Sequence, residues 1–253
     1  MRTAGLTHLT NAKRRTKNRD GLGRFGGKAY FCPTLNVENM KQLLVFSLFI
    51  ASAAGLGAQV HLEPLSRTDS AAIYCERVPD SLNTEAVKYS KQLYSLLLKG
   101  ADPEKDFCLI MQHSFQGERA LLLRPGEKFG RLTVRTMTEN LWVANHNGHK
   151  ARVIESEQSI EQVLSDAIQH AFTEALTHVA DKPHDKGFDG TVYLLLMPGD
   201  SGRWTTGTIW SPVEDSPTFN LTQRLTELLD MPLDGDTSTM QRELNALRFD
   251  EDE

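Results

Sequence analysis

The sequence predicts an α+β domain with a single antiparallel sheet, built from a meander plus a hairpin, and with helices packed mainly on one face. Two observations predict it. Short apolar runs separated by turn residues cluster in two stretches of the chain, and amphipathic helical patterns lie before, between and after them. Because the strands cluster instead of alternating singly with helices, antiparallel pairing is favoured over βαβ units.

The first regular element is an amphipathic helix over about residues 81–98, after a proline-containing lead at 60–79. Apolar side chains recur there at steps of three and four residues: Leu82, Ala86, Tyr89, Leu93 and Leu97. Gly100 follows and favours a helix end.

Short apolar runs then predict the strands of a meander: Phe107–Gln112, Ala120–Arg124, Leu132–Thr136, Leu141–Asn145 and Lys150–Ile154. The dipeptides Gln116-Gly117, Pro125-Gly126 and Asn147-Gly148 separate these runs, as hairpin turns require. A second hairpin is expected from Thr191–Met197 and Arg203–Trp210 around the turn at 198–202.

The longest helical pattern covers residues 159–179, where Ser159 and Gln162 match a capping box and the apolar face continues without a gap to Val179. Ser216 and Pro217 open a further helix, and a last short helix is expected at about 238–248. In outline this order resembles the small chaperones of secretion systems, although this chain has extra strands and topology alone carries no function.

Residues 40–58 predict a secretory signal peptide, because a positive start at Met40-Lys41 is followed by an apolar run at 43–50 and small residues at 51–58. A membrane span needs about 20 apolar residues, and this core is shorter. The mature chain is therefore expected to begin near Gln59, within a few residues, with no stable membrane span after cleavage.

Residues 1–39 form a basic extension with eight Lys or Arg against Asp20 and Glu38. The simplest hypothesis is a misassigned start, with translation beginning at Met40. The alternative is a cytosolic basic tail before an inner-membrane signal anchor, which the positive-inside rule orients with the following domain outside. Both hypotheses export residues 59–253 as a single α+β domain with an acidic C-terminal tail, either periplasmic or secreted.

The charge of the exported part limits its partners. The whole chain has a formal net charge of −5, but 19 of its 28 basic and 31 of its 33 acidic residues lie in 59–253, which therefore carries −12. Nucleic acid is disfavoured as a partner because its phosphates would be repelled. A protein or a cell-envelope component is expected instead.

Two cysteines remain in the exported part, Cys75 and Cys108. In an oxidising compartment such a pair is expected to form a disulfide, which would contribute roughly 3–4 kcal/mol to stability in the chain-entropy model. The alternative is a pair of buried thiols. No Cys or His lies at metal-binding spacing from either cysteine.

Two patterns suggest hydrolase chemistry. Gly199-Asp200-Ser201-Gly202 matches the tetrapeptide around the nucleophile of trypsin-like serine proteases, but two helices precede it where that family has an all-β chain, so a hairpin turn is favoured. His170, Glu174 and His178 lie at four-residue steps on the long helix and are candidate ligands of a divalent metal, with Asp181 and His184 just beyond. A solvated polar face is the alternative. No other cofactor is expected.

A third pattern suggests ligand stacking. Alternation along the last strand places Trp204 and Trp210 on one face, where they are candidates for stacking on a sugar or peptide. Packing beneath a helix is the alternative, for these residues and for Trp142. Taken together, the patterns favour an exported, non-enzymatic binding or interaction module, with a metal-dependent or serine hydrolase of the periplasm as the alternative.

Overall fold

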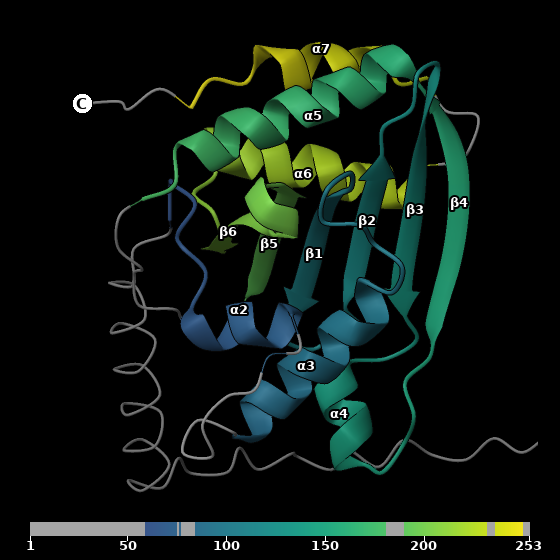
Figure 1. Ribbon diagram of the computed structural model, residues 1–253, viewed down its shortest axis with the longest axis vertical. Coiled ribbons are helices and arrows are strands. Elements are labelled where there is room, and N and C mark those ends of the chain that lie inside the picture. The colour runs from purple at the N-terminus through teal and green to yellow at the C-terminus, as the bar shows by residue number, and fades with distance from the viewer. Residues whose placement is uncertain (1–58, 75, 77–83, 181–189, 232–235, 250–253) are drawn as a thin grey trace, which may run out of the picture. The chain divides into compact units, whose positions relative to one another are not determined.

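In the computed structural model, which describes residues 59–74, 76, 84–180, 190–231 and 236–249, six strands form one antiparallel sheet (Figure 1). The strands are β1 Phe107–His113, β2 Arg119–Arg124, β3 Phe129–Met137, β4 Val153–Glu161, β5 Thr191–Pro198 and β6 Trp204–Trp210. Their spatial order is β4-β3-β2-β1-β5-β6, so β1 to β4 form a meander and the β5–β6 hairpin pairs beside β1. The predicted extension and signal peptide, 1–58, lie outside the described residues.

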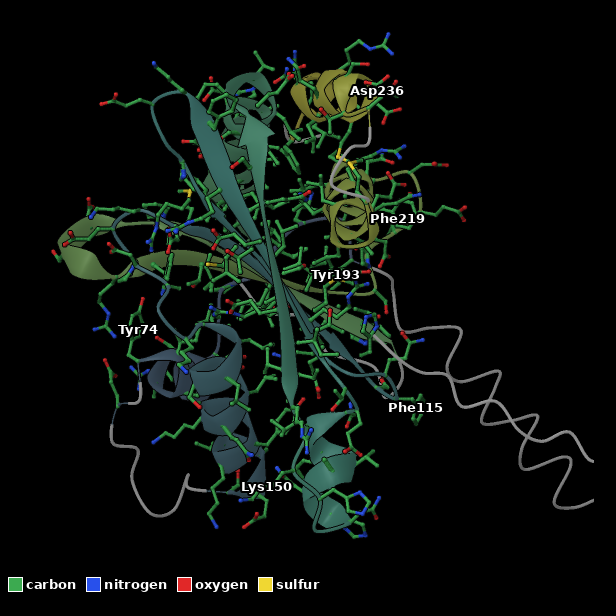
Figure 2. The ribbon with its side chains drawn as sticks, turned by 90° about the vertical axis from the view of Figure 1, so that its right-hand side faces the viewer. Tyr74, Phe115, Lys150, Tyr193, Phe219 and Asp236 are labelled. Carbon is green, nitrogen blue, oxygen red and sulfur yellow. The ribbon has the colours of Figure 1, made fainter. Side chains whose placement is uncertain are left out.

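Helices lie against both faces of this sheet. The larger layer consists of α5 Gln162–Thr177, α6 Pro217–Asp230 and α7 Ser238–Ala246. The opposite layer consists of α2 Arg67–Ile73 and α3 Glu85–Leu97, with α4 Leu141–His146 beside α3. Figure 2, in which the sheet is seen almost edge-on, shows α6 and α7 on one side and α3 on the other. The predicted α+β fold with one antiparallel sheet is confirmed; of the helices described, three lie on each side of the sheet, and those on the α5 side are together longer.

The second helical layer is explained by the strand sequences. Central strands carry continuous apolar runs, and a strand covered on both faces needs apolar side chains at every position. In β2, Leu121 and Leu123 contact the core under α5, whereas Leu122 contacts the core under α3. In β1, Leu109 contacts the core under α5 and Ile110 contacts the core under α3. The sheet therefore has a core on each side.

One predicted strand is wrong, because residues 141–146 form helix α4. Asn140 caps this helix, since its side-chain oxygen accepts a hydrogen bond from the Val143 amide at 3.1 Å. The Asn140 side-chain amide also donates to the carbonyls of His113 and Gln116, both at 3.1 Å. A run of four apolar residues fits helix and strand equally well, and the cap decides between them.

The start of the long helix is also corrected. Residues 159–161 pair with β3 in the last part of β4, and α5 begins at Gln162 with no side-chain cap, so the predicted capping box is wrong. Ile160 belongs to the strand but is buried in the same core as Leu164. Because Ile160 faces the same core as α5, the apolar spacing of the helix continues in the sequence into the end of the strand. The fourth strand covers 153–161 and not 150–154.

The segment after the predicted cleavage region lies along the outer edge of β6. Glu63 and Thr208 exchange backbone hydrogen bonds at 2.7 and 2.9 Å, and the Gln59 carbonyl accepts from the Val213 amide at 2.9 Å. Residues 59–63 thereby satisfy backbone groups that an edge strand would leave open. Among the described residues no helix is long and apolar enough to cross a membrane.

Candidate binding groove between α3 and α4

A groove of about 410 Å³ lies between α3 and α4, on the side of the sheet opposite α5. Its walls come from two helices far apart in the sequence, which Figure 1 shows side by side. The lining side chains combine two aromatic rings with polar groups: Glu85, Lys88, Tyr89, Gln92, Trp142, Asn145 and His146.

The aromatic part of the groove is the pair Trp142 and Tyr89. Trp142 is 51% exposed, which is unusual for the largest apolar side chain. Its ring lies 5.8 Å from that of Tyr89, centroid to centroid, at an interplanar angle of 74°. This edge-to-face arrangement is a favoured aromatic geometry, and it holds the indole in place while leaving much of it open to solvent.

A buried carboxylate fixes both walls of the groove. Glu118 is fully buried, and its Oε1 accepts a hydrogen bond from the Tyr89 hydroxyl at 2.6 Å. Its two oxygens also accept from the Leu141 amide, at 3.2 and 3.0 Å. Burial, and then the contact with Glu118, raise the pKa of Tyr89 far above its usual range, so the phenol remains a hydrogen-bond donor. One side chain therefore ties α3 to the start of α4.

Polar contacts complete the rim. The Asn145 amide donates to the Gln92 side-chain oxygen at 2.9 Å, which joins the two helices a second time. Lys88 pairs with Glu85 at 2.7 Å within α3. The walls are thus tied together at Glu118 and again at the rim, and a groove fixed by its own contacts would bind a ligand at a lower entropy cost than one that must first be ordered.

The structure separates the two tryptophans predicted to stack on a ligand. Trp204 is half-buried against the core under α3, and its backbone amide donates to the Tyr74 hydroxyl at 2.6 Å. Trp210 lies at the other end of β6. Six residues of strand span about 20 Å, so a single sugar ring cannot contact both indoles.

The predicted metal ligands share one side of α5 without converging. His170 is exposed, whereas His178 follows the last helical residue and its Nδ1 lies 2.8 Å from the Glu174 carbonyl oxygen. Within the described part of the chain, no group of three or more His, Cys, Asp or Glu side chains is placed to hold a metal ion. Asp181 and His184 lie outside the described residues.

Ser201 lies in the turn of the β5–β6 hairpin, where Asp200–Gly202 form a single 3-10 turn. Its φ of 60° is left-handed, a conformation that tight turns use. Among the residues that the structure describes, no hydrogen bond joins Ser201 to a histidine, the usual general base of a serine nucleophile.

Cys108 is a fully buried residue of β1. Burial raises the pKa of its thiol well above the ordinary value, which disfavours a reactive thiolate. Its predicted partner, Cys75, lies outside the described residues. Ala72, near the end of α2, belongs to the same buried cluster as Cys108. The disulfide stays a prediction.

In two other cavities, polar lining groups pair with other groups of the protein. A cavity of about 180 Å³ beside the end of α3 is lined by ion pairs, including Arg124 with Asp106 at 2.6 Å and Arg135 with Glu155 at 2.7 Å. A cavity of about 430 Å³ between β5 and α6 contains Tyr193 and Phe219, labelled in Figure 2. There the Thr226 hydroxyl donates to its own helix, to the Thr222 carbonyl at 2.6 Å. The α3–α4 groove differs from both because it exposes an indole.

The groove was not predicted from the sequence. The sequence pattern places Tyr89 on the apolar face of a helix and Trp142 in a strand. The available signals were the capping residue Asn140 and the isolated acid Glu118 before an apolar strand. No protein-family model, curated protein or solved structure matches the chain, so the groove is interpreted from its own geometry.

Proposed function

We propose that this protein is an exported, non-enzymatic binding module, periplasmic or secreted, that holds a protein or cell-envelope partner in the α3–α4 groove. The observation that carries the proposal is the half-exposed indole of Trp142, fixed against Tyr89 by the buried Glu118. Tryptophan and tyrosine dominate the binding energy of protein interfaces, above all where they are held in place before binding.

The export part of the proposal rests on the signal-peptide pattern at 40–58. The burial of Gln59, directly after that pattern, supports a mature chain that begins at or before this residue. An oxidising compartment would also permit the proposed Cys75–Cys108 disulfide. Retention of the apolar segment as an inner-membrane anchor is the alternative, and it leaves the groove on the exported side.

A hydrolase is the less supported alternative. The aromatic groove contains His146 but no serine, cysteine or threonine among its lining residues that would act as a nucleophile. A metal-dependent reaction at His170, Glu174 and His178 needs three ligands around one ion, but His178 lies past the end of α5 and its Nδ1 is 2.8 Å from the Glu174 carbonyl oxygen.

Affinity isolation of the tagged protein from the envelope and medium of its own host tests the proposal. Three forms are compared: the natural protein, Trp142→Ala, and the control Val163→Ala, which removes an exposed apolar side chain on α5. A partner retained by the natural protein and by the control but lost with Trp142→Ala supports the proposal. A partner that all three forms retain equally, or only non-specific material, contradicts it.

A further inference from the structure

We infer that the α3–α4 groove binds an uncharged saccharide unit, whose ring stacks on Trp142 and whose hydroxyl groups bond to the polar side chains of the groove. This inference rests on the proposed function, because it names the chemistry of the partner for the same groove. Three properties of the lining side chains support it: the open indole, the exposed polar groups and the balanced charge.

The indole of Trp142 offers a flat apolar surface that the protein fixes but does not cover. The ring of Tyr89 meets it at 74°, so that ring covers at most one of the two indole faces. Trp142 remains 51% exposed. A pyranose ring presents C–H groups on its faces, and these pack against the electron-rich face of an aromatic ring. Trp142 is therefore held as a stacking surface for a sugar ring.

The other lining side chains supply hydrogen bonds beside that surface. Five of the seven lining residues are polar, and all five are exposed: Glu85, Lys88, Gln92, Asn145 and His146. The Asn145 amide donates to Gln92 at 2.9 Å and the reverse contact measures 3.5 Å, so each amide keeps a further donor and a further acceptor position. A hydroxyl group both donates and accepts, and it matches such amides.

The groove has no net charge to offer an ionic ligand. With histidine neutral, the charged lining residues are Glu85 and Lys88, and their side chains pair at 2.7 Å. A charged ligand would compete with this pair and gain no net attraction from the lining. The hydroxyl groups of an uncharged ligand can bond to both members of the pair without separating them.

A sugar ring fits this lining better than the apolar side chain of a protein partner. Among the described residues, those that line the groove include no aliphatic side chain. A leucine placed against Trp142 would remove the neighbouring amides from water without giving them a partner, which costs free energy. The volume of about 410 Å³ lies at the small end of the range for ligand sites, roughly 300–1,000 Å³, and suits one or two sugar rings.

The same lining predicts binding without cleavage. Glycoside hydrolysis commonly uses two carboxyl groups, one on each side of the scissile bond. Within the described lining of the groove, Glu85 is the one carboxylate, and it is paired with Lys88. We therefore expect the groove to hold a saccharide and to leave its glycosidic bonds intact.

Calorimetric titration of the protein, purified from the envelope or medium of its host, tests the inference. The ligands are cellotriose, maltotriose and the trimer of N-acetylglucosamine. Sorbitol, which has the hydroxyl groups of glucose but no ring, is the matched control. We expect at least one trisaccharide to bind with a dissociation constant below about 1 mM, and sorbitol not to bind. Raising the salt from about 0.1 to about 1 M should change the affinity less than about twofold, because no net charge is involved.

Substitutions locate the binding in the groove. Trp142→Ala should weaken it at least tenfold, whereas Phe129→Ala, which removes an exposed aromatic ring on β3, should leave it unchanged. Trp142→Phe keeps part of the stacking surface and should cost less affinity than Trp142→Ala. Gln92→Ala should weaken binding several-fold, because a partner of the sugar hydroxyls is lost. Unchanged thermal unfolding shows that each variant is folded, as expected for side chains that are exposed.

Two sources supply ligands of this chemistry, an envelope polysaccharide and a free oligosaccharide. Co-sedimentation with insoluble wall polysaccharide of the host, lost with Trp142→Ala, identifies the polymer, and binding of the soluble trisaccharide alone identifies the free sugar. Reducing ends should not increase in either incubation. An increase that is lost with Glu85→Gln would show that the groove cleaves its ligand and would overturn binding without cleavage.

The remaining outcomes separate the inference from the proposed function. If no trisaccharide binds at about 10 mM while a host partner still depends on Trp142, only the inference fails. If a leucine-containing peptide or adenosine monophosphate binds through Trp142 and the sugars do not, the ligand class is wrong and the inference is overturned. If no sugar binds and no host partner depends on Trp142, the proposed function fails as well.

Discussion

The Tyr89 hydroxyl donates a 2.6 Å hydrogen bond to the buried carboxylate of Glu118, which also accepts from the backbone of Leu141. These residues come from α3, from the loop before β2 and from the start of α4. Because the contacts of Glu118 join residues that are far apart in the sequence, the groove forms only when the tertiary structure is complete. These contacts also mean that the shape of the groove depends on a residue that does not line it.

Glu118→Ala should lower the free energy of unfolding by about 2–4 kcal/mol, because the Tyr89 hydroxyl and the Leu141 amide lose a buried partner. Glu118→Gln, which keeps an acceptor, should cost less. Urea denaturation measures both. The control Glu127→Ala lies in an exposed turn and should change stability by no more than about 0.5 kcal/mol. Equal effects of Glu118→Ala and Glu127→Ala would refute the structural role of Glu118.

Stability should fall at alkaline pH. Burial raises the pKa values of Tyr89, Tyr94 and Tyr193 above the ordinary value of 10.0. The unfolded chain ionises its tyrosines near pH 10 and the folded chain does so only at higher pH, so stability is present below pH 10 and lost as the pH rises beyond it. Urea midpoints at about pH 8 and pH 11 test this. A midpoint that does not move for the natural protein, or one that moves equally in Tyr89→Phe, would argue against the contribution of Tyr89.

Leu62→Ala should destabilise the fold by about 2–4 kcal/mol, because this side chain is 1% exposed and packs into the core under α5. Val60→Ala, two residues earlier and 42% exposed, is the matched control and should be nearly neutral. Comparing the two variants distinguishes the loss of a buried side chain from the effect of any substitution in residues 59–63. Similar unfolding free energies for both would show that residues 59–63 are not an integral part of the fold.

The proposed disulfide predicts that Cys75 and Cys108 resist alkylation in denaturant until a reductant is added. Reduction should then lower stability by about 3–4 kcal/mol in the chain-entropy model. Non-reducing peptide mapping of protein isolated from the periplasm or medium identifies the pair directly. Alkylation of both thiols in denaturant without reductant would establish the alternative, two free thiols.

Sequence patterns predicted the elements whose apolar periodicity is long or bounded by strong turn residues. The face of α5 and the β5–β6 hairpin are examples, and α6 begins at the predicted Ser216-Pro217 cap. The helix α2 was missed because only seven residues follow its cap at Ser66, within a proline-containing lead. A short element has too few residues for its hydrophobic periodicity to be recognised.

The α3–α4 groove could not be predicted in the same way. Its determinants are the contact of Tyr89 with Glu118, which are 29 residues apart, and the exposure of Trp142. A tyrosine at a core-facing helical position is expected to pack in the core, and a tryptophan within an apolar run is expected to be buried. Only the tertiary structure shows that one hydroxyl is tied to a buried acid and that the neighbouring ring is left open.

Site-specific photo-crosslinking in the native host tests the central claim most directly. A photoreactive residue replaces Val143, which is exposed beside Trp142, or Val163 on α5 as the control. The account predicts one dominant cross-linked partner from position 143, none from position 163, and loss of the product when Trp142 is changed to alanine. The same products from both positions, or no product at 143 that depends on Trp142, would contradict it.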